Sequence, residues 1–277
     1  MKPLTLGHSP DPDDAFMFWA MREDRIDQEG LAFTHVLQDI ETLNRRALQA
    51  ELDVTAVSLH AFAHLQGRYG LLSCGASIGD GYGPMVVSRE PLLARDLGRI
   101  KLAVPGTMTS AFLALKLHTP EFAYEVVPFD RIPQEVASGR FAAGLLIHEG
   151  QLTYRQQGLA LVVDLGAWWH EQTGLPLPLG VNVVRLDLGE ALCRKIGRVL
   201  QRSIRYGLEH RREAVQDALR YGRDLDHAQA DRFIGMYVND FTLDFGPRGR
   251  EGCRLLLARG AERGILPATA GELVFVG

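Results

Sequence analysis

Short β-rich runs alternate with helical segments along the first two-thirds of this chain. The expected strands are at 4–7, 54–59, 85–88, 102–104, 124–127, 144–147, 161–163 and 181–184. Helices are expected at 13–21, 109–117, 133–138 and 190–208, and the last third is expected to be mostly helical. Because such alternation is typical of parallel strands joined by helical crossovers, the sequence predicts an α/β fold with mainly parallel sheets.

Length and charge limit the kinds of partner this protein can have. The 277 residues allow one large domain or two lobes, and a formal net charge of -4 gives no attraction to nucleic acid or to an anionic membrane. The N-terminal residues do not read as a secretory signal, and no apolar run approaches the ~20 residues of a membrane-spanning helix. We therefore expect a soluble cytoplasmic protein that binds a small molecule. Its three cysteines should be reduced thiols, and the arginine-rich segment 194–212 a solvated helix face.

Several short motifs match catalytic or metal-binding patterns only in part. Residues 75–79 spell G-x-S-x-G, but no helix can begin in the glycine-rich segment 80–84, so Ser77 is not expected to be a nucleophile. The two His-Glu pairs, at 148–149 and 170–171, lack the second histidine of a zinc motif. No metal site is predicted from them.

An acidic loop precedes the first expected helix. Its carboxylates, Asp11, Asp13 and Asp14, could bind a hard cation or could cap the helix, and the pattern favours capping.

Two segments keep a functional interpretation. In residues 102–112 a strand is followed by a hydroxyl-rich loop and a helix, so Thr107, Thr109 and Ser110 should gather at a helix N-terminus. Such an end binds a carboxylate or phosphate, although plain helix capping explains the pattern equally well. His148 follows the expected strand 144–147, at the end where α/β folds place ligand sites, while a structural histidine remains the alternative.

Longer strings carry a family resemblance over nearly the whole chain. They are SPDPDDAF at 9–16, DIETLN at 39–44, Pro105-Gly106 with Thr109, IHE at 147–149, DLGAWW at 164–169 and GLPLPLG at 174–180. In these strings the chain resembles the 1,4-dihydroxy-6-naphthoate synthase family of the futalosine route to menaquinone. The first loop departs from the S-P-C-P-N-D often found in that family, because Asp11 and Asp13 replace the cysteine and the asparagine.

The resemblance implies a two-lobed, periplasmic-binding-protein-like (type II) fold with a ligand cleft between the lobes. We expect lobe 1 to comprise residues 1–88 and 181–277, and lobe 2 to comprise residues 89–180. The implied reaction converts cyclic dehypoxanthinyl futalosine to 1,4-dihydroxy-6-naphthoate and dihydroxyacetone without metal or organic cofactor. His148 would be the proton-abstracting base. The candidate contacts to a carboxylated substrate are Asn44, Ser58, Thr107, Thr109 and Ser110.

Three other functions are compatible with such a fold. A solute-binding protein would need export, which the N-terminus does not indicate. The related chorismate dehydratase does not share the strings at 164–169 and 176–180. The effector domain of a transcription regulator would need a helix-turn-helix ahead of residue 1. The sequence does not indicate the number of chains in the functional protein.

Overall fold

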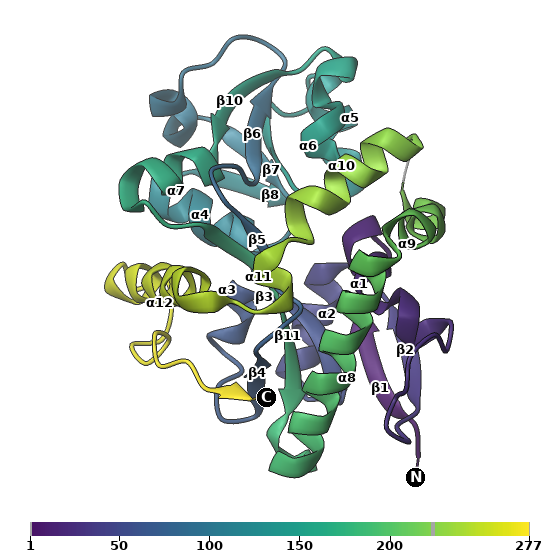
Figure 1. Ribbon diagram of the computed structural model, residues 1–277. Coiled ribbons are helices and arrows are strands. Elements are labelled where there is room, and N and C mark those ends of the chain that lie inside the picture. The colour runs from purple at the N-terminus through teal and green to yellow at the C-terminus, as the bar shows by residue number, and fades with distance from the viewer. Residues whose placement is uncertain (1, 223–224, 277) are drawn as a thin grey trace.

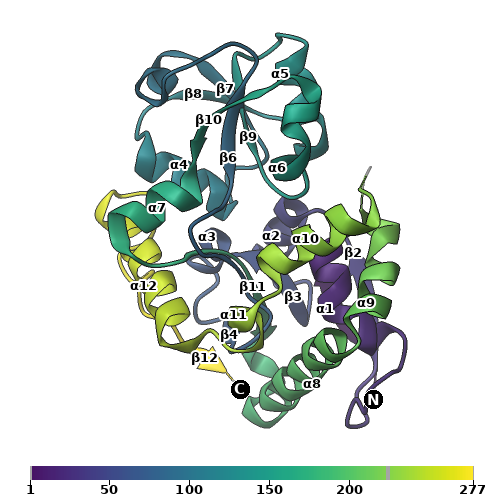
Figure 2. The same cartoon turned by 45° about the horizontal axis from the view of Figure 1, so that its top comes forward.

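Two β-sheets organise the chain, and each lies in its own lobe (Figure 1). The computed structural model describes residues 2–222 and 225–276. We use lobe 1 for the part built on the seven-stranded sheet and lobe 2 for the part built on the five-stranded sheet. Figure 2 shows the two lobes one above the other.

The sheet of lobe 1 combines the beginning and the end of the chain. Its strands, in spatial order, are β12 (Phe275–Val276), β4 (Tyr69–Leu72), β11 (Leu177–Arg185), β3 (Val54–Ser58), β1 (Leu4–His8) and β2 (Phe33–Leu37), with β5 (Ser77–Gly79) paired to β11. β1 pairs in parallel with β2 and β3, whereas β11 is antiparallel to β3, β4 and β5. All residues of β3 are buried, because the sheet flanks this strand on both sides.

The sheet of lobe 2 comes from the middle of the chain. Its order is β10 (Ala160–Asp164), β6 (Met85–Ser88), β9 (Ala143–Leu146), β7 (Lys101–Val104) and β8 (Ala123–Val126). β7 is parallel to β8 and β9, whereas β6 is antiparallel to β9 and β10. Both sheets are therefore mixed, and the expectation of mainly parallel sheets was wrong. The antiparallel strands β6 and β11 enter their sheets directly from the other lobe, without the helical crossover that a parallel connection needs.

Helices cover both sheets. In lobe 1 they are α1 (Pro12–Arg22), α2 (Ile40–Leu48), α3 (Leu59–Phe62), α8 (Glu190–Glu209), α9 (Arg211–Ala218), α10 (His227–Tyr237), α11 (Asp240–Leu243) and α12 (Gly246–Glu262). In lobe 2 they are α4 (Ser110–His118), α5 (Ile132–Ala137), α6 (Gly150–Thr153) and α7 (Leu165–Thr173). Within residues 2–222 and 225–276, no helix combines the length and the apolar character needed to cross a bilayer.

The chain crosses between the sheets twice, at 80–84 and again at 174–176. These crossings lie a few residues before the expected lobe bounds at 88 and 180, since β6 pairs within lobe 2 and β11 begins at Leu177. The start of α7 packs directly on the first crossing, where a Cβ added at Gly166 would lie 2.0 Å from the carbonyl oxygen of Tyr82. Only glycine fits this close approach.

One hydrophobic cluster passes from lobe 1 into lobe 2. It includes Val57 and Leu71 from the first sheet, Leu102 and Val104 from the second, and Leu257 from α12, all fully buried. Burial of apolar surface is the main stabilising contribution in a fold of this kind. The lobes are therefore joined along this side by continuous core packing, and the space between them opens elsewhere.

Candidate active site

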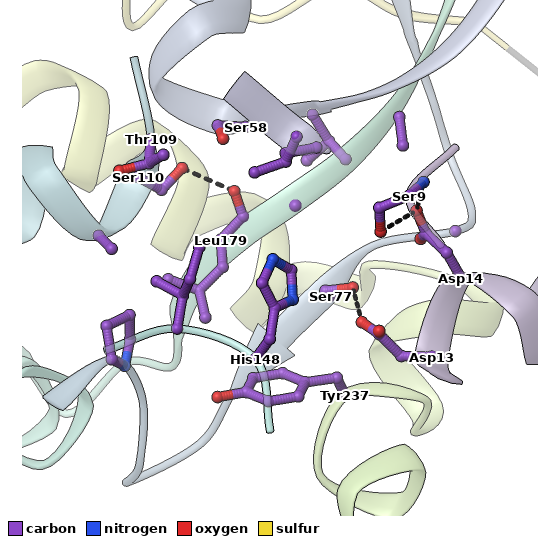
Figure 3. Close-up of a pocket in the computed structure, with 18 of the residues that line it drawn as sticks. Ser9, Asp13, Asp14, Ser58, Ser77, Thr109, Ser110, His148, Leu179 and Tyr237 are labelled. Carbon is purple, nitrogen blue, oxygen red and sulfur yellow. Dashed lines mark hydrogen bonds between the residues drawn. The ribbon is translucent and has the colours of Figure 1, made fainter. Parts of the chain in front are cut away.

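A cavity with about 660 Å³ of space between its atoms lies between the two lobes. Lobe 1 contributes Ser9, Asp13, Asp14 and Ser58 to its lining, and lobe 2 contributes His148. Figure 3 shows the His148 ring pointing into this space, between Ser58 on one side and the two aspartates on the other.

The backbone of His148 directs its side chain into the cavity. β9 ends at Leu146, and His148 has a φ of 54°, in the left-handed region that costs a residue with a side chain about 1 to 3 kcal/mol. Its Nδ1 lies 3.3 Å from Oδ2 of Asp11, and its ring centroid is 4.8 Å from that of Phe129. Its Nε2 is buried and has no hydrogen-bond partner among the described residues. One ring nitrogen is thus held by the protein, and the other is left for a ligand.

Opposing effects act on the pKa of His148. Burial, the largest of them, lowers the pKa, but the surrounding carboxylates of Asp11, Glu149, Asp13 and Asp14 raise it. The net result is a pKa above the ordinary value of 6.5. A titratable group whose pKa is shifted by burial and by specific charged neighbours, and which lies in a cleft, is a candidate for proton transfer.

Two further carboxyl groups line the cavity beside His148. Oδ2 of Asp13 accepts a hydrogen bond from the Ser77 hydroxyl at 3.3 Å. Oδ2 of Asp14 accepts from the backbone N–H and the hydroxyl of Ser9 at 2.7 and 2.9 Å. Burial is the main cause that raises the pKa of Asp13 to about 6 and that of Asp14 to about 7. Both carboxyl groups therefore keep their protons to a higher pH than an exposed aspartate does.

The first turn of α4 faces the cavity with hydroxyl groups. Thr109 is the N-cap of α4: its hydroxyl accepts from the N–H of Phe112 at 3.1 Å and donates to the Gly106 carbonyl at 3.0 Å. The Ser110 hydroxyl donates to the Leu179 carbonyl at 2.6 Å. Thr109, Ser110 and Ser58 all line the cavity. Because the first N–H groups of a helix have no partner within the helix, this end can bind an anion.

Asn44 and Thr107 do not belong to the set of residues that line this cavity. Asn44 lies behind Ser58: its Nδ2 donates to the Ser58 hydroxyl at 3.1 Å, and its Oδ1 accepts from the Ser58 N–H at 2.8 Å. Asn44 is completely buried. Its two hydrogen bonds therefore orient Ser58 from behind the cavity wall. Of the five candidate contacts, Ser58, Thr109 and Ser110 are brought together at the cavity.

Sequence reasoning did not identify several residues of the site. Ser9, Ser77 and Gln151 line the cavity, as does Tyr237 from α10, whose hydroxyl donates to Oε1 of Gln151 at 2.7 Å. Ser9 belongs to the string at 9–16 that carried the family resemblance, and Ser77 was considered only as a nucleophile. No local pattern marks Gln151 or Tyr237, because their pairing depends on how α10 packs against lobe 2.

Comparisons with known proteins agree with this architecture. A family model described as menaquinone biosynthesis matches residues 4–262. A Thermus thermophilus protein named 1,4-dihydroxy-6-naphtoate synthase is 42% identical over 265 residues, which cover 96% of each chain. A crystal structure of a protein from Archaeoglobus fulgidus has a TM-score of 0.92 and 45% identity, covering 95% of this chain and 98% of that one. A Candida albicans protein with the generic periplasmic binding protein fold has a TM-score of 0.73 and 13% identity. The match covers 100% of this chain and 98% of that one.

The fold is thus a two-lobed α/β fold of the periplasmic-binding-protein type, as the sequence predicted. The chain belongs to the menaquinone biosynthesis family, which confirms the resemblance seen in the sequence.

Proposed function

We propose that this enzyme converts cyclic dehypoxanthinyl futalosine to 1,4-dihydroxy-6-naphthoate and dihydroxyacetone in the cytoplasm. The observation that carries the proposal is the His148 imidazole, which presents a buried Nε2 without a partner among the described residues to an interlobe cavity. The named relative from Thermus thermophilus supports the same reaction.

His148 acts as the general base in this proposal. Its Nε2 takes a proton from the bound substrate, and the electrons left behind drive cleavage of the carbon-carbon bond that releases the three-carbon sugar. Formation of the aromatic naphthoate supplies much of the driving force. Burial of the base in a less polar environment than water strengthens the electrostatic interactions around it.

The substrate carboxylate binds at the opposite side of the cavity. Ser58 and the N-terminus of α4, at Thr109 and Ser110, face this position. A helix N-terminus favours an anion through its unpaired N–H groups and its dipole. This arrangement directs the part of the substrate away from the carboxylate toward His148.

Turnover of the cyclic substrate tests the proposal. Purified protein should form the naphthoate, followed by its absorbance, together with an equal amount of dihydroxyacetone. Saturable binding without product would support the solute-binding alternative. Consumption of chorismate in a parallel assay, with the cyclic substrate untouched, would support the dehydratase alternative.

A further inference from the structure

The Asp11 carboxylate and the His148 imidazole meet across the space between the lobes. Asp11 follows β1 in lobe 1, and His148 follows β9 in lobe 2. Oδ2 of Asp11 lies 3.3 Å from Nδ1 of His148, and the Asp11 side chain is only 1% exposed. A carboxylate so buried is costly unless a partner compensates its charge. The imidazole provides such a partner.

Asp11 is placed to cap a helix but does not do so with its side chain. It is the N-cap residue of α1, where an aspartate usually accepts a hydrogen bond from the helix N–H groups, yet its carboxylate makes no capping hydrogen bond. The expectation that the acidic loop serves helix capping was therefore wrong for Asp11. The carboxylate is directed toward the other lobe instead.

We propose that Asp11 is a positioning residue that fixes the tautomer of His148, so that the two lobes together assemble the base. This proposal rests on the function proposed above. The Asp11 carboxylate lies 3.3 Å from Nδ1 and can only accept a hydrogen bond, so its negative charge favours the neutral tautomer with the proton on Nδ1. Nε2 then carries the lone pair and faces the cavity. When Nε2 takes the substrate proton, the imidazolium is stabilised by Asp11.

The location of the pair links the base to lobe closure. A hydrogen bond also joins the lobes, from Tyr237 of α10 to Gln151 of α6. If the lobes separate, Asp11 and His148 separate with them, and the imidazole is no longer held in one tautomer. The base is complete only when the lobes enclose the cavity.

Other groups around His148 do not replace Asp11. Glu149 is its neighbour in the chain, and Asp13 and Asp14 face it from the first turn of α1, each adding negative charge. Phe129 packs against the ring and is uncharged, and Tyr237 lines the same cavity with a pKa raised by burial. The ion pair at Nδ1 is with Asp11. Loss of Asp11 should therefore change the tautomer of His148. Loss of a more distant charge, such as that of Glu149, should leave the tautomer unchanged.

Two substitutions of Asp11 test this role in the full-length protein. Asp11→Asn keeps the size of the side chain but adds an amide donor that favours an unprotonated Nδ1. The proton then sits on Nε2, which can no longer act as the base, so kcat should fall about a hundredfold or more. Asp11→Ser keeps a good N-cap residue and removes the carboxylate without that donor, so the loss should be smaller, about tenfold. KM should change by less than about threefold in both, because Asp11 is outside the set of residues that line the cavity.

The pH profile separates positioning from structural support. Because Asp11 raises the pKa of His148, its removal should lower that pKa and move the acidic limb of kcat/KM to lower pH. The matched control is Asp217→Asn, since Asp217 is also buried and paired, with Arg22 and Arg220, but lies outside the cavity lining. This control should lower the melting temperature and leave the pH profile unchanged.

Nitrogen NMR of the His148 ring, assigned by its absence in His148→Asn, tests the pair without substrate. A lower His148 pKa and a loss of the Nδ1-protonated tautomer in the Asp11 variants would support the proposal. An unchanged acidic limb and an unchanged tautomer in folded variants would overturn it. If the wild-type protein fails to turn over the cyclic substrate while the NMR changes occur, the proposed function is wrong and the pair itself stands.

Discussion

The two sides of the cavity differ in chemistry. The titratable side consists of Asp13, Asp14 and His148, with Asp11 paired to His148, and burial raises the pKa of Asp13 to about 6 and that of Asp14 to about 7. The hydroxyl side consists of Ser58, Thr109 and Ser110, whose hydroxyl groups already have protein partners. The first side can move protons, whereas the second offers fixed neutral dipoles. In the proposed mechanism, proton transfer and anion binding therefore occur at separate walls of one cavity.

The two sides also differ in what they cost the fold. Buried carboxyl groups without full compensation destabilise the protein when they are charged, as the raised pKa values of Asp13 and Asp14 indicate. Buried hydroxyl groups with partners carry no such penalty. Perturbed pKa values concentrate where chemistry occurs, so the costly side is the one expected to react.

The largest effect should come from the titratable side, at His148. His148→Asn preserves much of the volume but cannot accept the proton, so turnover should fall by about a hundred- to ten-thousandfold. Substrate binding should change little and the protein should still fold, although with a lower melting temperature, because the buried Asp11 carboxylate loses its partner. His118→Asn, at the end of α4 and away from the cavity, is the matched control. Near-normal turnover by a folded His148→Asn protein would falsify the base assignment.

A smaller effect is expected on the hydroxyl side, and mainly in binding. Ser58→Ala removes a hydroxyl facing the carboxylate, a loss of roughly 1.5 to 3 kcal/mol for a hydrogen bond to a charged group. KM should rise about tenfold or more while kcat stays within a few fold. Thr107→Val should have less effect, because Thr107 is not in the cavity lining. Equal rises in KM for both variants would place the carboxylate nearer Thr107.

The contact between α10 and lobe 2 should give a weaker effect. Tyr237→Phe removes the hydrogen bond to Gln151 and keeps the ring, at a cost of about 0.5 to 1.5 kcal/mol. Because this bond joins the lobes, its loss should raise KM a few fold without moving the pH profile. Tyr221→Phe, outside the cavity lining, serves as control. A kcat loss as large as that of His148→Asn would show that Tyr237 belongs to the reacting groups.

The smallest effect concerns stability and depends on pH. The folded-state pKa of Asp14 is raised from 3.8 to about 7, so its stabilising contribution is present below pH 3.8 and is lost as the pH rises through 7. Asp14→Asn removes the buried charge and can still accept both hydrogen bonds from Ser9. At pH 8 the variant should melt higher, by about 2 to 4 °C for each kcal/mol recovered. Calorimetry at pH 5 should show a smaller difference; the reverse order would disprove the assigned shift.

Local pattern predicted much of the fold. The helix 13–21 corresponds to α1, and the strands 4–7 and 102–104 correspond to β1 and β7, because apolar runs and Pro12 mark their bounds. β5 is outside the predicted strands, since its three residues form a strand only through pairing with β11. The mixed direction of the sheets depends on where the chain crosses between lobes, and no local signal gives this.

The site could be predicted only in part. Four predicted residues lie at the cavity: His148 follows a strand, Ser58 ends one, and Thr109 and Ser110 begin a helix, which is why they could be named. The pairing of Asp11 with His148 could not be predicted. An aspartate at the start of a helix is normally an N-cap, and only the packing of the two lobes brings His148 beside it. Roles that depend on contacts across the cleft are not encoded in neighbouring residues.

The position of β11 in the sheet of lobe 1 has a consequence for synthesis of the chain. β11 lies between β3 and β4, but it is made only after the whole of lobe 2. During translation, the five strands of lobe 2 emerge as one continuous segment and can pair completely, whereas β3 and β4 wait without their shared neighbour. Unpaired strand edges invite wrong association. The lobe that begins first is therefore the one that finishes last.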